Sequence, residues 1–426
     1  MYNLLMTALL AAIAPGMPVH HPAARGRYAD FKGGKAAGEV SDGRGASAVE
    51  VPIVEGAQPV PSGGAIPFRR ATTERTSRLE RTTIAALAAA ETQVQIQVEG
   101  SGYMYGIDVE FDIETAANAA VVAYHEDAPW SVISSVVLGD VNGELWNMTG
   151  FHTRVVDLYS GLVSSNDQAS TDVQVFEQLA GAVGRGGSVH GHLWVPVAIN
   201  KRNLLGLVSN QDRAQKYQLR TNIAAGGVGT IYTTAPTTPG AVSIDRTYLN
   251  FSVPAGQNAQ GVPQEQTPPK FGVLFYGTQT VSPALPSSNT TQNHFLPRIG
   301  NTIRLLILVF RDGNGATART DSEANPPTLI KFTLGDTPLF AETAGARRKI
   351  MRDRYGFDAP AGVYVYDFIT DIMNRAGSEF GDDYLFTAGL NNAQFEISYG
   401  AGWAASSSLT ILTHDCIVPP GVNLYD

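Results

Sequence analysis

A pair of histidines separated by one residue could bind a metal ion. His190 and His192 flank Gly191, and side chains two positions apart on a β-strand point to the same face. Imidazole nitrogens are common ligands of transition metals, but a metal site of this kind also needs an acidic ligand, expected about four residues further on. Pro196 and Val197 stand at that place. We therefore interpret the pair as part of a polar strand face, and we expect neither a metal at these histidines nor a cofactor.

A row of carboxylates is the second group that could support chemistry. It consists of Asp108, Glu110, Asp112 and Glu114, which occupy every second position of one candidate strand. Their oxygens could converge on a calcium ion. A row of like charges along one strand is also common where that face meets solvent or another subunit. Both interpretations stay open from the sequence.

No catalytic set can be picked out. The sequence shows no nucleophile with an evident base, and the glycine-rich residues 184–187 lack the Lys-Ser/Thr pair that completes a phosphate-binding loop. We therefore do not predict an enzyme.

The elements that must position these side chains are strands. Residues 94–98 and 107–114 alternate between apolar and polar residues, which is typical of half-buried antiparallel strands. Residues 303–310 form a continuous apolar run that ends in a glycine turn, which predicts a strand buried on both faces in the centre of a second sandwich. Many short strands with turns rich in Gly and Pro indicate an all-β sandwich or barrel.

The second half of the chain repeats the layout of the first half. Leu138-Gly139-Asp140 recurs 196 residues later as Leu334-Gly335-Asp336, and a tyrosine follows 19 residues after each aspartate, at Tyr159 and Tyr355. Two more pairs of segments follow in the same order, residues 191–197 with 362–368 and residues 214–219 with 393–397. Four matches in one order predict a duplicated β-domain.

The N-terminal part differs in composition from the rest. Residues 15–68 mix Gly, Pro and Ala without a period, which predicts an arm, and a helix is expected over about Thr72 to Glu91 because arginines recur there at three-residue spacing before an Ala-Leu run. The predicted organisation is an arm and short helix in residues 1–92, a first β-domain in 93–255, a linker in 256–270, and a second β-domain with the C-terminal tail in 271–426.

Charge is scarce and unevenly distributed. Charged residues make up 16% of the chain, against about 25% in an average soluble protein, and a surface poor in charge is expected where neighbouring subunits cover it. Residues 1–90 carry ten Lys and Arg and seven Asp and Glu, whereas the rest carries 20 and 32. A net charge of −9 argues against specific binding to nucleic acid. The single cysteine, Cys416, is expected to be buried in the last strand.

The duplicated pattern and the segment 362–368, Gly-Val-Tyr-Val-Tyr-Asp-Phe, resemble the double jelly-roll major capsid proteins of tailless icosahedral viruses, especially tectivirus-like bacteriophages. This resemblance implies two tandem eight-stranded jelly rolls and a homotrimer that forms a pseudo-hexagonal block of the shell. It also implies lateral contacts between trimers, contacts with penton and minor capsid proteins, assembly in the host cytoplasm, and a place in the virion.

In that family the N-terminal region points towards an internal membrane. The candidate interior- or membrane-facing residues are Arg69, Arg70, Arg75, Arg78 and Arg81, whose charges could meet anionic headgroups. Packing of this basic segment on the acidic body of the trimer is the alternative.

Two other functions share the strand pattern. A tandem carbohydrate-binding or receptor-binding spike protein would gather exposed aromatic side chains on one face, but the four tryptophans are scattered along the chain. A two-domain cupin-like enzyme would bind a metal at His190 and His192. A stable native trimer would favour the capsid prediction over both.

Overall fold

A computed structural model describes most of the chain beyond residue 63. The described residues are 64–115, 121–160, 174–176, 187–199, 201, 204–212, 216–283, 285, 290–313, 318–369, 384–404, 406–420, 422 and 424. The predicted arm up to residue 63, and residues 214 and 215 of the predicted repeat, lie outside these ranges.

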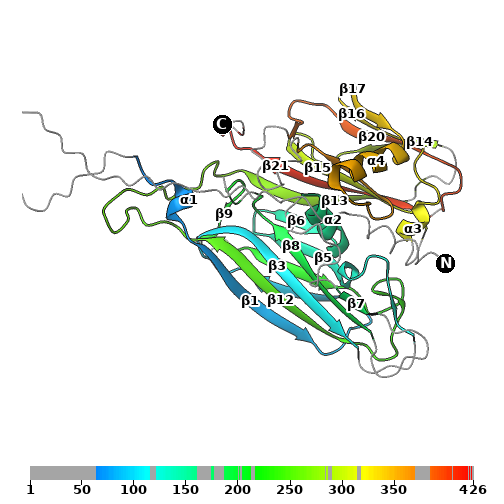
Figure 1. Ribbon diagram of the computed structural model, residues 1–426, viewed down its shortest axis with the longest axis horizontal. Coiled ribbons are helices and arrows are strands. Elements are labelled where there is room, and N and C mark those ends of the chain that lie inside the picture. Colours follow the sequence, from blue (N-terminus) through cyan, green and yellow to red (C-terminus); the bar gives the residue numbers. More distant parts are fainter. Residues whose placement is uncertain are drawn as a thin grey trace, which may run out of the picture. The chain divides into compact units, whose positions relative to one another are not determined.

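The first half of the described chain forms two antiparallel sheets (Figure 1). One contains, in spatial order, β1 (Glu74–Ile84), β12 (Ala241–Phe251), β3 (Tyr103–Glu114), β8 (Ser188–Pro196) and the short β7 (Gln174–Phe176), with β9 (Val208–Ser209) paired to β3. The other contains β2 (Thr92–Gln97), β10 (Gln218–Ile223), β5 (Ile133–Gly139) and β6 (Glu144–Met148). Apolar residues of both sheets belong to one core cluster, so the sheets enclose a common interior.

The second half repeats this order strand by strand. Its first sheet contains β13 (Leu274–Pro283), β21 (Ser408–Ile417), β15 (Thr302–Arg311) and β18 (Val363–Asp367), with the short β19 (Leu385–Phe386) paired to β15. Its second sheet contains β14 (Thr290–Phe295), β20 (Ala393–Tyr399), β16 (Leu329–Leu334) and β17 (Thr337–Glu342). Among the described residues each half thus has two sheets of four main strands, which makes an eight-stranded jelly roll. The all-β fold of two tandem jelly rolls is confirmed.

Short helices and a small two-stranded sheet complete the described structure. They are α1 (Phe68–Ala71), the 3-10 helix η1 (Trp130–Val132), α2 (Gly150–Ser160), α3 (Ala318–Ser322) and α4 (Ala344–Tyr355), with β4 (Ala123–Tyr124) paired to β11 (Tyr232–Thr234). No described helix is long and apolar enough to cross a bilayer.

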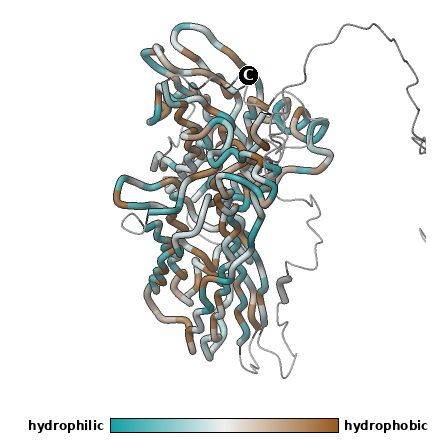
Figure 2. The backbone as a smooth tube through the Cα atoms, turned by 90° about the vertical axis from the view of Figure 1, so that its left-hand side faces the viewer, coloured by the Kyte–Doolittle hydropathy of each residue, from teal (hydrophilic) through white to brown (hydrophobic). Residues whose placement is uncertain are grey.

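The predicted alternation in the first roll is present along β3. Ile107 and Val109 are fully buried, whereas the intervening Asp108 is half-buried and Glu110 is exposed. Figure 2 shows the same change between hydrophobic and hydrophilic residues along the strands. Because neighbouring side chains of a strand point to opposite faces, β3 turns one face to the core of the first roll and its carboxylates to the outside.

The predicted apolar strand, β15, is buried on both faces, as expected. Leu306 and Leu308 belong to the core cluster of the second roll, whereas Ile307 and Val309 belong to the larger cluster that also fills the first roll. The outward face of this strand is therefore buried against the first roll. Cys416 is also buried, in β21 as predicted, and burial raises the pKa of its thiol to about 12.

The two rolls share a continuous sheet. β6 of the first roll pairs in parallel with β13 of the second, with Trp146 opposite Gly277. A Cβ atom at Gly277 would lie 2.2 Å from the indole ring of Trp146, so only glycine leaves room for the ring. A glycine and a tryptophan far apart in the sequence thus set how closely the rolls approach at this point.

The helix predicted over Thr72 to Glu91 is wrong. Residues 74–84 form β1, which pairs antiparallel with β12 from Glu74 opposite Phe251 to Ile84 opposite Val242. The helix that is present, α1, is shorter and lies before that segment. Threonines favour extended backbone, and pairing with a strand more than 150 residues away outweighs the three-residue spacing of the arginines. The predicted domain boundaries stay predictions, although β1 brings the first strand of the first roll forward to residue 74.

The predicted repeat corresponds to a repeated unit of hairpin and helix. Leu138 and Leu334 stand near the ends of β5 and β16, and each hairpin leads into a helix, α2 or α4. Both helices begin after a threonine whose side chain accepts a backbone N–H, Thr149 from His152 at 3.1 Å and Thr343 from Ala346 at 3.2 Å. Counted from these caps, the two helices are equivalent with an offset of 194 residues. The offset of 196 between the tyrosines therefore combines a shorter second hairpin with a longer second helix.

Candidate functional site

The predicted carboxylate row lies on the outward face of the first roll. Cross-strand neighbours of Glu110 are Asp245 on β12 and His192 on β8, so an acidic residue of β12 extends the row sideways. We call this surface the acidic face; its members are Asp108, Glu110, Asp112, Glu114 and Asp245. Within the described residues no group of three or more His, Cys, Asp or Glu side chains is arranged to hold a metal ion.

The predicted histidine pair lies beside this row. The Nδ1 atom of His190 contacts a carboxylate oxygen of Asp112, and its Nε2 atom lies 3.7 Å from Oε1 of Glu110. His190 and His192 both point outward from β8, and both are half-buried. The interpretation as a polar strand face agrees with these contacts, in which carboxylates of β3 surround one imidazole.

Three of the five candidate arginines, Arg75, Arg78 and Arg81, lie on β1 at one edge of the same sheet. Arg78 donates a hydrogen bond from Nε to Oδ1 of Asp245 at 2.9 Å, and Nε of Arg81 lies 3.7 Å from the other carboxylate oxygen. Both arginine side chains are more than half exposed, and exposed pairs of this kind contribute little to stability, typically below about 1 kcal/mol. These two arginines therefore serve to border the acidic face.

The other three candidate arginines lie nearer the start of the described chain. Arg69, on α1, donates from Nε to the carbonyl oxygen of Lys201 at 2.9 Å, and its guanidinium lies 5.5 Å from the ring centre of Phe251. Arg70 and Arg75 are exposed. The structure thus divides the five candidates into a group of three around α1 and the start of β1, and a pair beside Asp245.

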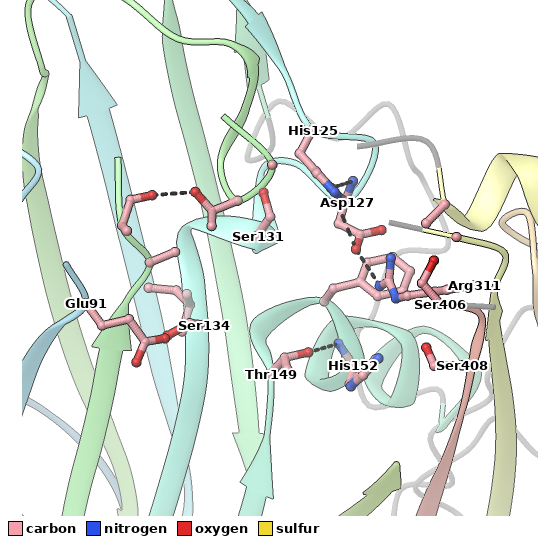
Figure 3. Close-up of a pocket in the computed structure, with 18 residues that line it drawn as sticks. Glu91, His125, Asp127, Ser131, Ser134, Thr149, His152, Arg311, Ser406 and Ser408 are labelled. Carbon is pink, nitrogen blue, oxygen red and sulfur yellow. Dashed lines mark hydrogen bonds and ion pairs between the residues drawn. The ribbon is translucent and has the colours of Figure 1, made fainter. Parts of the chain in front are cut away.

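A cavity of about 440 Å³ lies where the two rolls meet (Figure 3). Its lining comes from both halves and includes His125, Asp127 and His152 of the first roll with Arg311 and Ser406 of the second. Figure 3 shows His125 and Asp127 together on one side, with Arg311 beside Asp127 and His152 below them. Polar side chains from both rolls therefore meet in a partly enclosed space.

Asp127 links the two rolls through two arginines. Its carboxylate oxygens lie 2.5 Å from Nε of Arg319 and 2.5 Å from a terminal nitrogen of Arg311, and the aspartate is 5% exposed. Burial alone would raise the pKa of this carboxyl, but Arg311 and Arg319 together hold the pKa below its usual value. The buried carboxylate of Asp127 thus forms ion pairs that connect the two jelly rolls.

Glu126 and Phe151 extend this contact. The Glu126 carboxylate accepts the backbone N–H groups of Arg319 at 2.6 Å and Thr320 at 3.0 Å, so it binds the backbone of α3. The guanidinium of Arg319 lies 4.3 Å from the ring centre of Phe151, at the start of α2, a distance at which cations are attracted to aromatic faces. No sequence pattern predicted these residues, because the partners lie more than 160 positions apart.

Helix α2 is enclosed between the rolls. All its residues, Gly150–Ser160, are buried. The Nδ1 atom of His152 lies 2.6 Å from Oε1 of Gln279 on β13, Arg304 on β15 donates to the carbonyl oxygen of Ser160 at 3.0 Å, and the ring of Tyr159 lies 4.9 Å from that of Tyr355. Burial lowers the pKa of His152 to about 4, so its imidazole is neutral at physiological pH.

Three solved structures resemble this chain in fold. The major capsid protein of Sulfolobus turreted icosahedral virus matches at a TM-score of 0.54 and 13% identity, over 82% of this chain and 97% of the viral protein. The fold is that of double jelly-roll viral capsid proteins. The PBCV-1 virus capsid matches with a TM-score of 0.52 and 15% identity, over 81% of this chain and 93% of that one. The Faustovirus major capsid protein gives 0.52 and 8%, over 82% and 90%.

At the level of sequence, no protein-family model and no curated protein matches the chain. The double jelly-roll fold therefore rests on the arrangement of the strands.

The tryptophans do not form the exposed aromatic surface that a carbohydrate-binding double jelly roll would need. Trp146 is 1% and Trp403 is 2% exposed, each within a core cluster. Trp130 and Trp194 are half-buried, and the Trp130 indole lies over the guanidinium of Arg154 at 5.1 Å. These positions give the carbohydrate-binding and spike alternatives no support.

Proposed function

We propose that this chain is the major capsid protein of an icosahedral virus, a structural subunit rather than an enzyme. In this proposal three copies form a trimer whose six jelly rolls make a pseudo-hexagonal block, and trimers then contact each other and penton and minor capsid proteins in the shell. A tectivirus-like bacteriophage, assembled in the host cytoplasm, is the proposed source, and the virion is the proposed location.

One observation carries the proposal. Two jelly rolls with the same sheet order stand in tandem, and this arrangement matches 82% of this chain to 97% of a capsid protein. The duplication has a physical use, because three chains then supply six similar jelly rolls, and a trimer can fill a position of sixfold symmetry. A surface poor in charge supports the same proposal, since obligate interfaces commonly bury more than about 2,000 Å².

The interior-facing role of the arginines belongs to the same proposal. Arg69, Arg70 and Arg75 lie where the described chain begins, around α1 and the start of β1. In a shell over an internal membrane, basic side chains near the surface contribute about 1 kcal/mol each through anionic headgroups. Arg78 and Arg81, which border the acidic face, contribute to contacts between protein surfaces instead.

The native mass of the purified protein tests the capsid proposal. Three chains of 45.3 kDa should scatter light as a particle of about three times that mass, and concentrated trimers should form shells or sheets visible by electron microscopy. A stable, folded monomer at all concentrations would contradict the proposal.

Binding to vesicles tests the membrane part separately. The trimer should float with phosphatidylserine vesicles and not with phosphatidylcholine vesicles, and Arg70→Glu with Arg75→Glu should abolish flotation. The matched control is Lys216→Glu with Arg220→Glu, an equal change of charge on and beside β10, a strand of the other sheet. Equal flotation of both double variants would leave the capsid proposal standing and remove the membrane from it.

A further inference from the structure

Equivalent surfaces of the two rolls have different partners. On the second roll, the outward sheet face is apolar and lies under α2 of the first roll, because Leu305, Ile307, Val309 and Leu412 belong to the core cluster that contains α2. The strand registers identify the equivalent positions on the first roll. Arg304 of β15 and Tyr105 of β3 both lie at a register shift, and their carbonyl oxygens accept equivalent backbone N–H groups, those of Phe368 and Val197. Leu305 and Ile307, opposite His414 and Leu412 of β21, therefore correspond to Gly106 and Asp108 of β3, opposite Leu249 and Thr247 of β12.

Two of the covered apolar positions therefore have acidic equivalents. Ile307 and Val309 correspond to Asp108 and Glu110, whereas Leu305 and Leu412 correspond to Gly106 and Thr247. The Glu110 and Asp112 side chains are 55% and 46% exposed. The place that α2 occupies on the second roll is thus an open, acidic surface on the first.

Helix α4 is the equivalent of α2, and it is covered on one side only. Ala344, Arg347 and Met351 are buried, and the last two contact the backbone of Val365 on β18. The exposed positions form the α4 face, which consists of Gly345, Ala346, Lys349, Ile350, Arg352 and Asp353.

The α4 face corresponds to the residues with which α2 contacts the second roll. With the N-caps Thr149 and Thr343 in register, Phe151, His152 and Tyr159 are equivalent to Gly345, Ala346 and Asp353. The first three contact Arg319, Gln279 and Tyr355 of the second roll, respectively. The side of α4 that is open in this chain is therefore the side that α2 uses for docking.

Charge distinguishes the two helices in the same way that it distinguishes the two sheet faces. Val155 and Leu158 of α2, both in the apolar cluster, correspond to Lys349 and Arg352 of α4. An apolar helix face lies on an apolar sheet face within the chain, whereas a face with two cations and the acidic face are both open. Opposite charges on separate surfaces attract and select a partner.

The sheet edges of the two rolls also divide into covered and open ones. β6 pairs with β13 across the roll junction, whereas their equivalents β17 and β1 each pair, among the described residues, only with their inner neighbours β16 and β12. An unpaired strand edge is a site for adding another strand. One open β17 edge and one open β1 edge per chain could meet between copies as β6 and β13 meet within a chain.

We propose that the α4 face of one copy docks on the acidic face of the next copy, with β17 beside β1, which repeats between chains the contact that α2 and β6 make within the chain. Different surfaces of the two copies meet, so the contact is heterologous and can close into a ring. This inference rests on the proposed trimer and names the residues that form it. Arg78, which is equivalent to Gln279 by its position opposite Thr247, would then lie opposite Ala346 of the neighbour.

A disulfide across the proposed contact is the sharpest test. Ala346→Cys and Arg78→Cys in one chain should form intermolecular disulfides on oxidation and yield a covalent trimer, about three times 45.3 kDa, on a denaturing gel without reductant. Either single variant, and the control pair Ala346→Cys with Lys216→Cys, should stay monomeric on the same gel. The native Cys416 is buried and should not interfere.

Charge reversal provides an independent readout. Lys349→Glu with Arg352→Glu should convert the native trimer into folded monomers, and adding Glu110→Lys with Asp112→Lys in the same chain should restore the trimer because both surfaces are then reversed. Lys216→Glu with Arg220→Glu controls for net charge, and circular dichroism reports whether each variant is folded. A wild-type trimer that tolerates the reversal and shows no cross-link would overturn this contact and leave the capsid proposal intact. A wild-type monomer would overturn both.

Discussion

Helices α2 and α4 occupy equivalent places in two equivalent jelly rolls, yet every residue of α2 is buried and half of the α4 residues are exposed. Both begin at a threonine cap, and both follow an equivalent hairpin. They differ in what lies on the outer side, since the second roll covers α2 and nothing within the described chain covers the α4 face. The residues differ accordingly, with Val155 and Leu158 in one helix and Lys349 and Arg352 in the other.

This comparison teaches that the strand order and the local signals of a duplicated domain can stay the same while its outer surface changes. The outward face of β15 is apolar and the outward face of β3 is acidic, although the two strands occupy equivalent positions in their sheets, β15 between β21 and β18 and β3 between β12 and β8. Burial against the other roll requires apolar side chains, whereas a face that stays open in the single chain must stay soluble. The following changes test how far this difference extends.

Removal of Asp127 should have the largest effect. Asp127→Ala removes the nearer carboxylate from the buried Arg319 and the partly buried Arg311, and loss of one partner of a buried ion pair costs about 3 to 5 kcal/mol. Urea unfolding should show this decrease in the free energy of unfolding. Glu144→Ala, which removes the partner of Arg220 on the exposed β10 surface, should cost less than about 1 kcal/mol. Equal effects of the two changes would contradict a special role for the roll junction.

Acid should lower the stability of the folded protein through His152, which lies on the covered helix α2. Its pKa is about 4 in the folded protein and about 6.5 when unfolded, so the unfolded state binds a proton first as the pH falls. Stability from this group should therefore be lost between pH 6.5 and 4, by up to about 1.4 kcal/mol per pH unit. The variant His152→Gln should show a correspondingly flatter dependence of unfolding free energy on pH. The α4 equivalent is Ala346, so Ala346→Gln is the control that should leave the slope unchanged.

A side chain at Gly277 should lower the free energy of unfolding. Gly277→Ala places a methyl group against the Trp146 ring, and overpacking of this kind costs roughly 1 to 3 kcal/mol. At the equivalent place on β1, opposite Leu249, the chain has the exposed Thr76, so Thr76→Ala should change the unfolding free energy by less than about 0.5 kcal/mol. Gly227→Ala, where a Cβ meets nothing within 4 Å, is the control for alanine itself.

The helix caps should give the smallest effect and no difference between the rolls. Thr149→Ala and Thr343→Ala each remove a side-chain acceptor from a helix N-terminus, which costs about 1 kcal/mol. Thermal unfolding of both variants measures the two losses under one condition. A much larger loss at Thr149 would mean that the covered helix depends on its cap more than local geometry predicts.

Much of the fold could be predicted from sequence because it follows from local patterns. Alternation over residues 107–114 predicted β3 and the outward position of its carboxylates, and the continuous run over 303–310 predicted a strand buried on both faces. The helix over Thr72 to Glu91 failed because arginines at three-residue spacing are compatible with more than one conformation. Its partner, β12, was needed to decide.

Less of the candidate site could be predicted. The histidine pair and the carboxylate row were visible as residue types at fixed spacing, but their meeting, with His190 between Asp112 and Glu110, depends on the pairing of β8 with β3. Asp127 and Arg319 carry no sequence signal, since they lie 192 positions apart. The capsid function and the residue roles remain proposals.

The sequence by itself determined that the chain is all-β, that the domain occurs twice, and that acidic and apolar strand faces exist, because strand period, turn residues and repeated order are local properties. Only the tertiary structure decided which of two equivalent faces is covered, which edges are open, and which distant charges meet. These depend on pairing between segments far apart in the chain, and a local pattern contains no information about which distant partner it will meet.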